Sequence, residues 1–283
     1  MATPQPLRHR VAVVTGASRG AGRGIAVVLG GAGATVYVTG RSMHGGPRTL
    51  ERPGTIDETA DEVTRRGGVG IAVRCDHTHD DEVASLFRRV GGEAGRLDIL
   101  VNNAWGGYEI DPDTDLPFWE IELRHWDLMF DAGVRAQMTS SRFGVPLMLR
   151  TGQGLIVNTT WVLGTPHGNA FYEVAKTASH QLTASMADDL RDAGVAVVAV
   201  SPGFMRGERM NLSPETASRA ESTEYVGRAV TGLASDPNVI EKSGLLLTVV
   251  DVAREYGFTD VDGRVMTPFW ERYYDELART RGG

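Results

Sequence analysis

Runs of apolar, largely β-branched residues recur along the chain, and longer stretches with helical spacing separate them. Within each run the apolar residues are continuous rather than alternating with polar ones, which is typical of strands buried on both faces of a parallel sheet. The pattern therefore predicts about seven strands. They cover residues 11–15, 34–40, 70–76, 97–104, 154–160, 195–203 and 244–250.

The clearest helical pattern lies over residues 172–193. Its apolar side chains recur every four residues and form one stripe that would pack on the sheet, and Gly194 then ends the helix. The stripe consists of Ala178, Leu182, Met186 and Leu190. Alternation of strand and helix predicts an α/β fold, a doubly wound parallel sheet with helices on both faces. We expect a single domain over residues 1–283, because no repeat or low-complexity segment interrupts the pattern.

Two connections are longer than a compact domain needs, and such loops are usually functional or disordered. The first, near residues 42–56, is rich in Gly, Pro and Arg and could form a flap at the adenosine end of a ligand. The second, near residues 105–119, is rich in aromatic residues and is expected to form a wall for an apolar substrate. Its aromatic residues include Trp105, Tyr108, Phe118 and Trp119. A C-terminal tail near residues 268–283 is amphipathic enough to cover the domain or a partner subunit.

The composition is that of a soluble protein with a sizeable core, since 41% of the 283 residues are hydrophobic. A formal net charge of −7 gives little attraction to nucleic acid or to an anionic membrane, so neither partner is expected. The polar, proline-broken start resembles neither a signal peptide nor a membrane span, which favours a cytoplasmic location. Cys75, the one cysteine, is expected to be a buried structural thiol.

A glycine-rich turn, TGASRGAG, follows the first predicted strand. Gly16, Gly20 and Gly22 would let backbone N–H groups approach a pyrophosphate at the start of the next helix, where the helix dipole favours negative charge. Ser18 and Arg19 lie in the same turn and are expected to contact the cofactor. Glycines also serve tight turns for structural reasons alone, so the position after the first strand gives this motif its weight.

The end of the second predicted strand indicates which dinucleotide would bind. An acidic residue about 20 positions after the glycine turn would hold the ribose 2′-hydroxyl of NAD, but this chain has Arg41 there. Arg41 and Arg19 could instead bind a 2′-phosphate through charge-assisted hydrogen bonds, which predicts NADP(H) as the cofactor. For Arg41 alone, a solvated loop arginine is the alternative interpretation.

The segment FYEVAK, residues 171–176, places a tyrosine and a lysine four positions apart on one face of the predicted helix. A neighbouring ammonium stabilises phenolate and lowers the tyrosine pKa, which would make Tyr172 a usable general acid or base. Lys176 is one of only two lysines among 29 basic residues, and it could also reach ribose hydroxyls. Such pairs are common on solvated helices, so the interpretation depends on the surrounding motifs.

Together these motifs resemble the short-chain dehydrogenase/reductase family over nearly the whole chain. The matching stretches are TGASRGAG, Asn102-Asn103-Ala104, YEVAK and Pro202-Gly203, and segments 152–158 and 244–264 resemble one branch of the family. The resemblance implies that Asp76 touches the adenine and that Asn102 and Ala104 line the cofactor cleft. It also implies that Pro202 and Gly203 contact the cofactor.

The chain departs from the family pattern near the expected reaction centre. In place of a serine that binds the substrate's carbonyl oxygen it offers Thr159 and Thr160, and counting back from the tyrosine favours Thr160. Two strand-forming threonines without such a role are the alternative. Gly133 replaces an asparagine that holds a relay water, which predicts a rewired water path. Gly207 replaces a threonine beside the nicotinamide, and Trp105 replaces a glycine that follows the asparagine pair.

Several residues around this centre are predicted to border the substrate. They are Trp105, Trp161, His167, Phe204 and Met205. The segment 204–222 is expected to close over the substrate as a lid. His77 and His79 resemble a metal pair, but no metal site is expected, because they lie in a strand-to-helix turn where Thr78 could cap the next helix.

The sequence thus predicts an NADP(H)-dependent oxidoreductase that moves a hydride between nicotinamide and a carbonyl or secondary alcohol of a mainly apolar small molecule. Tyr172, Lys176 and Thr160 are the expected catalytic residues, and the first two would also contact the cofactor. The alternative is a dinucleotide-binding regulator or scaffold without catalysis, motivated by Gly133, Gly207 and the missing serine. A homodimer or homotetramer is expected, because members of the family usually form such assemblies.

Overall fold

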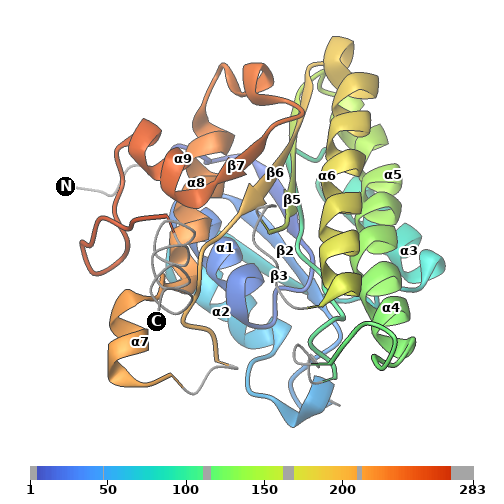
Figure 1. Cartoon of the computed structure of the whole chain (residues 1–283). Coiled ribbons are helices and arrows are strands. Elements are labelled where there is room, and N and C mark those ends of the chain that lie inside the picture. Colours follow the sequence, from blue (N-terminus) through green and yellow to red (C-terminus); the bar gives the residue numbers. More distant parts are fainter. Residues whose placement is uncertain (1–4, 47, 111–115, 162–168, 209–211, 269–283) are drawn as a thin grey trace.

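The computed structural model describes residues 5–46, 48–110, 116–161, 169–208 and 212–268, and its centre is one parallel sheet (Figure 1). The strands are β1 (Val11–Val14), β2 (Thr35–Gly40), β3 (Val69–Arg74), β4 (Ile99–Asn102), β5 (Gly154–Thr159), β6 (Val195–Ser201) and β7 (Leu246–Thr248). Their order in the sheet is β3-β2-β1-β4-β5-β6-β7, so the direction of winding reverses between β1 and β4. The predicted doubly wound α/β fold is confirmed.

Helices cover both faces of the sheet. They are α1 (Gly20–Gly31), α2 (Ile56–Arg65), α3 (Asp80–Glu93), α4 (Arg124–Met129), α5 (Ala136–Leu149), α6 (Ala170–Leu190), α7 (Pro214–Arg219), α8 (Thr223–Ser235) and α9 (Val249–Tyr256). Figure 1 shows α1, α2, α8 and α9 on one face and α3 to α6 on the other. None of the helices in the described ranges is both long and apolar enough to cross a membrane.

The continuous apolar strands are explained by two separate cores. Ala12 and Val14 of β1 belong to the core on the side of α1 and α8, whereas Val11 and Val13 belong to the core on the side of α3 and α5. Alternate side chains of one strand therefore both meet apolar neighbours, and a polar residue would be buried at either position.

All seven predicted strands are longer than those observed, most clearly at β4, β6 and β7. β6 ends at Ser201, and the following Pro202 has no N–H with which to continue the ladder. β7 ends at Thr248, whose side chain accepts a hydrogen bond from the backbone N–H of Asp251 and so caps α9. The predicted strand over residues 244–250 is therefore too long by two residues at each end, and its last two residues begin a helix.

Helix α6 begins two residues earlier than predicted, because Asn169 caps it by accepting a hydrogen bond from the backbone N–H of Tyr172 at 3.0 Å. Three members of the predicted stripe, Leu182, Met186 and Leu190, pack against the core on the side of α3 and α5, as predicted. The buried face is wider than this stripe, since Tyr172, Lys176, Ser179 and Thr183 are also buried. The helix therefore turns its tyrosine and lysine inward.

Candidate active site

A cavity of about 850 Å³ opens at the carboxyl ends of the strands, where open α/β sheets bind their ligands. It brings together most of the residues predicted from the sequence. They are Gly16, Ser18, Arg19, Gly20, Arg41, Asp76, Ala104, Trp105, Thr160, Trp161, Tyr172, Lys176, Pro202, Gly203, Phe204 and Met205. Gly22 and Asn102 are not among the residues that line it, and His167 lies outside the described residues.

The glycine loop between β1 and α1 has the backbone that a pyrophosphate site requires. Gly16 and Gly20 have positive φ angles of 63° and 56°, which residues with side chains rarely adopt. A Cβ on Gly16 would lie 2.8 Å from the Cα of Ala104, whereas a Cβ on Gly20 would meet nothing within 4 Å. Gly22 has a packing role instead, since a Cβ there would lie 2.4 Å from the Asn103 side chain. The open side of the loop is therefore at Gly20.

A negative charge already lies at the start of α1. The backbone N–H of Gly20 donates a hydrogen bond to Oε2 of Glu208 at 2.9 Å. N–H groups at a helix N-terminus favour anions, and this carboxylate already uses one of them. The loop therefore fits a pyrophosphate group, and Glu208 would have to release this hydrogen bond before a dinucleotide binds. No motif in the sequence indicates that Glu208 belongs to this site.

Three arginines, Arg19, Arg41 and Arg52, line the neighbouring part of the cavity, where β2 ends, and the charge of Arg48 also acts on Arg19. The pKa of Arg19 lies below its ordinary value, chiefly because its guanidinium is partly buried. The positive charges of Arg52, Arg48 and Arg41 lower this pKa further. Positive charge concentrated in this way fits a phosphate group. Arg48 and Arg52 belong to the 42–56 loop, whose arginine content was visible in the sequence but was not assigned to individual residues.

Arg41 is held by two carboxylates rather than by solvent alone. Its Nη2 donates to Oε1 of Glu109, and its Nη1 lies 3.8 Å from Oδ2 of Asp76. Asp76 also accepts a hydrogen bond from the hydroxyl of Thr78 at 2.8 Å. The predicted role of Thr78 as the cap of α3 is therefore wrong, since the N-cap residue is His79.

The two asparagines at the end of β4 have different positions. Asn102 is buried, and its Nδ2 donates to Oδ1 of Asn158 at 2.9 Å. Asn102 was predicted to line the cofactor cleft, but it is not among the residues that line the cavity, and its side chain binds Asn158 in the interior. Asn103 lines the cavity, and its Nδ2 donates to the carbonyl oxygens of Thr15 and Gly16 at 3.0 and 3.1 Å. It therefore fixes the glycine loop against β4.

Tyr172 and Lys176 lie on the buried face of α6, with exposed fractions of 5% and 7%. The lysine Nζ lies 5.3 Å from the centre of the tyrosine ring. Burial lowers the pKa of Lys176 to about 7, because the ammonium loses its hydration. The lysine therefore changes charge near neutral pH, close enough to the phenol to influence its acidity.

The hydroxyls of the two threonines at the end of β5 differ in their contacts. Oγ1 of Thr159 donates to the carbonyl oxygen of Asn102 at 3.3 Å. Oγ1 of Thr160 is buried without a hydrogen-bond partner in the described part of the chain, and an unpaired buried hydroxyl costs free energy. Both residues line the cavity. Thr160 therefore offers the hydroxyl that a ligand oxygen could use.

The aromatic residues predicted to form a substrate wall separate into two groups. Trp105 and Tyr108 line the cavity, and the Trp105 ring lies edge-to-face with Tyr172 at a centroid separation of 5.6 Å. Phe118 and Trp119 are 62% and 71% exposed and pack on each other, so this half of the prediction is wrong. The large apolar and aromatic residues of the cavity include Trp105, Tyr108, Met129, Trp161, Phe204 and Met205.

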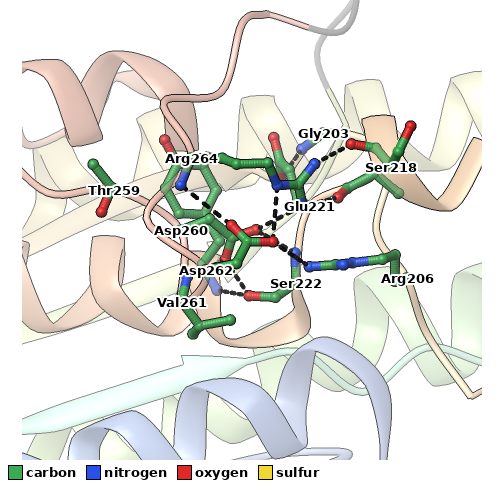
Figure 2. Close-up of polar contacts among 12 residues, drawn as sticks. Gly203, Arg206, Ser218, Glu221, Ser222, Thr259, Asp260, Val261, Asp262 and Arg264 are labelled. Carbon is green, nitrogen blue, oxygen red and sulfur yellow. Dashed lines mark hydrogen bonds and ion pairs between the residues drawn. The ribbon is translucent and has the colours of Figure 1, made fainter.

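The predicted lid, residues 204–222, is anchored where it begins and ends (Figure 2). The backbone N–H of Glu221 donates to the carbonyl oxygen of Phe204 at 2.8 Å, and that of Arg206 donates to the carbonyl oxygen of Glu221 at 2.7 Å. The carboxylate of Glu221 accepts a hydrogen bond from the N–H of Gly203 at 2.9 Å. The two ends of the lid segment therefore hold each other.

Asp260 lies at the centre of this anchor and is 1% exposed. Its carboxylate accepts hydrogen bonds from the hydroxyl and, at 2.8 Å, from the N–H of Ser222. It also lies 3.7 Å from the guanidinium groups of both Arg206 and Arg264 (Figure 2). Arg264 donates in turn to the carbonyl oxygen of Ala220 at 3.1 Å. The segment after α9 thus holds both ends of the predicted lid segment.

The two histidines after β3 have separate surroundings. His77 is buried, its Nε2 lies 2.8 Å from the Thr39 hydroxyl, and burial lowers its pKa to about 4, so it is neutral at pH 7. His79 is exposed. Within the described ranges, no three His, Cys, Asp or Glu side chains gather as a potential metal site. Cys75 is buried, as predicted.

Comparison with known proteins assigns the family. The model of the family described as short chain dehydrogenase matches residues 10–217. Dehydrogenase/reductase SDR family member 1 of Mus musculus is 39% identical, over 95% of this chain and 88% of the relative. The Homo sapiens protein of the same name is 40% identical, over 92% and 85%.

Solved structures agree with this assignment. A hydroxysteroid dehydrogenase from Escherichia coli is 27% identical with a TM-score of 0.72, covering 87% of this chain and 98% of its own. A short chain dehydrogenase from Mycobacterium thermoresistibile, at 24% identity, shares the fold with a TM-score of 0.78, covering 93% and 94%. The chain therefore belongs to the short-chain dehydrogenase/reductase family of nicotinamide-dependent oxidoreductases, in the branch of dehydrogenase/reductase SDR family member 1.

Proposed function

We propose that the protein is an NADP(H)-dependent oxidoreductase that moves a hydride between nicotinamide and a carbonyl or secondary alcohol of a mainly apolar small molecule. The observation that carries the proposal is the buried pair Tyr172 and Lys176, which shares one cavity with the glycine loop and Thr160. Burying an ammonium without a carboxylate partner is costly, and proteins keep such groups where they support chemistry.

The residues of the cavity have distinct roles in this mechanism. NADPH, when bound, supplies the hydride. In the reductive direction the Tyr172 hydroxyl donates a proton to the substrate's carbonyl oxygen, and the Thr160 hydroxyl orients that oxygen with a hydrogen bond. The Lys176 ammonium stabilises the phenolate that remains and would also hold ribose hydroxyls. The apolar wall excludes water and favours an apolar substrate.

The arginine cluster supports NADP(H) over NAD(H). Arg41→Ala is expected to weaken NADPH binding by about thirtyfold, because a 2′-phosphate would lose a charge-assisted partner. NADH binding is expected to change by less than about threefold, since NADH lacks that phosphate. Titration of both dinucleotides by calorimetry measures the two dissociation constants.

The control for this titration is Arg88→Ala, which removes an exposed arginine of α3 that does not line the cavity. It should leave both dissociation constants unchanged. Equal weakening of NADPH and NADH in Arg41→Ala, or a wild-type protein that binds NAD at least as tightly as NADP, would contradict the preference for NADP(H).

Thr160→Val is expected to lower kcat by about a hundredfold, because valine keeps the shape of threonine but cannot donate a hydrogen bond to the substrate oxygen. Thermal stability should not fall, since the lost hydroxyl is unpaired in the ligand-free protein. Steady-state kinetics and a melting curve measure the two effects. Thr160→Ser should keep most of the activity, and a larger loss in Thr159→Val would assign the role to Thr159 instead.

A regulator or scaffold without catalysis is the alternative function. An absorbance assay separates the enzyme from the regulator. The protein is mixed with NADPH and a panel of ketones, aldehydes and quinones, and the absorbance of reduced nicotinamide is followed. Binding without turnover on every substrate, in both directions, would favour the regulator. We further propose that the enzyme acts in the cytoplasm as a homodimer or homotetramer, which light scattering after size-exclusion chromatography would measure.

A further inference from the structure

Trp105 fills a slot whose shape depends on two glycines. A Cβ on Gly133 would lie 2.6 Å from the indole ring, and a Cβ on Gly107 would lie 2.8 Å from it. Side-chain atoms do not approach so closely, so a larger residue at either position would displace the ring. Gly133 belongs to a π-helical segment, Phe130–Arg135, between α4 and α5, and such segments are frequent at functional sites. The ring position is therefore set by its neighbours.

The face of the Trp105 ring meets the ammonium of Lys176. Nζ lies 3.5 Å from the ring centroid, well within the distance at which a cation is attracted to an aromatic face. Tryptophan gives the strongest attraction of this kind, and removal from water increases it. The edge-to-face contact with Tyr172 means that one indole touches both members of the catalytic pair.

No carboxylate among the described residues forms an ion pair with the Lys176 ammonium. Burial lowers the Lys176 pKa, and no charged side chain in the described part of the chain offsets this shift. Within the described ranges, the titratable groups close to the ammonium are Tyr172 and His180, and both belong to α6. Among the described residues, the indole is thus the group from another element that compensates the buried charge.

We propose that Trp105 is a positioning residue that keeps the Lys176 ammonium charged and directed at Tyr172. Burial alone drives the lysine toward its neutral form, and a neutral amine would stabilise the tyrosine phenolate far less. The ring face restores part of the lost stabilisation without admitting water. This role deepens the proposed function, on which its effect on turnover rests, but the charge of Lys176 can be measured without any turnover.

The chain allows a direct test, because Lys176 and Lys242 are its only lysines. Protein grown with lysine labelled with ¹³C at Cε should give two lysine NMR signals, whose pH titration yields both side-chain pKa values. In the ligand-free protein, Trp105→Leu is expected to lower the Lys176 pKa by about one unit. Trp105→Phe should give an intermediate value, since a phenyl face attracts the cation less strongly. The Lys242 signal serves as the internal control for folding.

A second variant keeps the tryptophan and moves it. Gly133→Ala places a methyl group against the indole and is expected to lower the Lys176 pKa in the same direction. Gly92→Ala, on α3, is its matched control, because a Cβ there meets nothing within 4 Å, and it should leave the pKa unchanged. An unchanged Lys176 pKa in Trp105→Leu would overturn the proposal. A higher one would too, because it would mean that the indole only excludes water.

Turnover provides a separate measurement. In the oxidative direction the phenolate of Tyr172 is required, so the rise of kcat with pH should move to higher pH in Trp105→Leu. A shifted Lys176 pKa in a protein that turns over no substrate would support the role of Trp105 while the proposed function failed. An unshifted Lys176 pKa in an active enzyme would refute the role of Trp105 while the proposed function stood.

Discussion

Tyr172→Phe is expected to lower turnover by at least about a thousandfold, while the dissociation constant of NADPH changes by less than about twofold. The substitution removes a single oxygen, so the buried face of α6 keeps its packing. Among the described residues that line this cavity, Tyr172 is the one whose phenol lies beside the buried Lys176. Single-turnover kinetics with NADPH measures the chemical step, and fluorescence titration of NADPH measures binding.

Tyr256→Phe is the matched control, because Tyr256 lies outside the residues that line the cavity and its hydroxyl donates to Asp236. It should leave kcat unchanged even if it lowers the melting temperature. Substantial hydride transfer in Tyr172→Phe would refute the assignment of the proton donor. Loss of NADPH binding in that variant would show that the tyrosine mainly holds the cofactor.

The fold was predictable because buried parallel strands carry a strong signal in the sequence. Continuous apolar runs and the helices between them specify the order of elements, and burial on both faces explains why the runs do not alternate. The error at β7 arose because Val249 and Val250 continue an apolar run while Thr248 already caps the next helix. A valine pair has no property that distinguishes strand from helix by itself.

The Asn102-Asn103 motif located the end of a strand at the site but did not show which of the two side chains faces the cavity. The sequence placed Asn102 and Asn103 at the end of a strand, but successive side chains on a strand point to opposite faces. Asn102 was assigned to the cofactor cleft from the family resemblance, and a motif does not show which of two neighbouring side chains faces the cavity. Asn102 binds Asn158 inside the protein, and Asn103 holds the glycine loop.

Contacts between distant segments were beyond sequence reasoning. Glu208 meets Gly20 across 188 positions, and Asp260 meets Ser222 across 38. Nothing in the local pattern of either acidic residue distinguishes it from a solvated side chain. Glu208 and Gly20 meet because they follow strands whose ends share one edge of the sheet, whereas Asp260 follows α9 and meets the residue that caps α8.

The departures Trp105 and Gly133 were considered separately in the sequence, yet in the structure they form one feature. The glycine leaves the room that the indole occupies, and the indole covers the lysine. The rewired water path expected at Gly133 stays a prediction, whereas the close fit of ring and glycine is an observation. The two departures fit each other sterically and place the indole on the lysine, which weakens the argument that they indicate an inactive protein.

Asp260→Asn is expected to lower the free energy of unfolding by about 3 kcal/mol and to loosen the base of the lid. Asparagine has nearly the shape of aspartate, but one of its two terminal atoms would present a donor to groups that are themselves donors. Ser222, Arg206 and Arg264 would compete for the single remaining oxygen (Figure 2). Urea denaturation measures the stability, and limited proteolysis of the folded protein measures the exposure of the lid.

The matched control is Asp262→Asn, two residues further along the chain. Asp262 pairs with the same two arginines, at 3.3 Å to Arg206 and 2.8 Å to Arg264, but its side chain is 37% exposed. Water can therefore replace its charge, and the loss should be much smaller than for Asp260. If the lid segment becomes no more susceptible to protease in Asp260→Asn than in Asp262→Asn, the buried carboxylate stabilises the fold without anchoring the lid. If the two variants also unfold at the same urea concentration, burial of Asp260 adds nothing to these ion pairs.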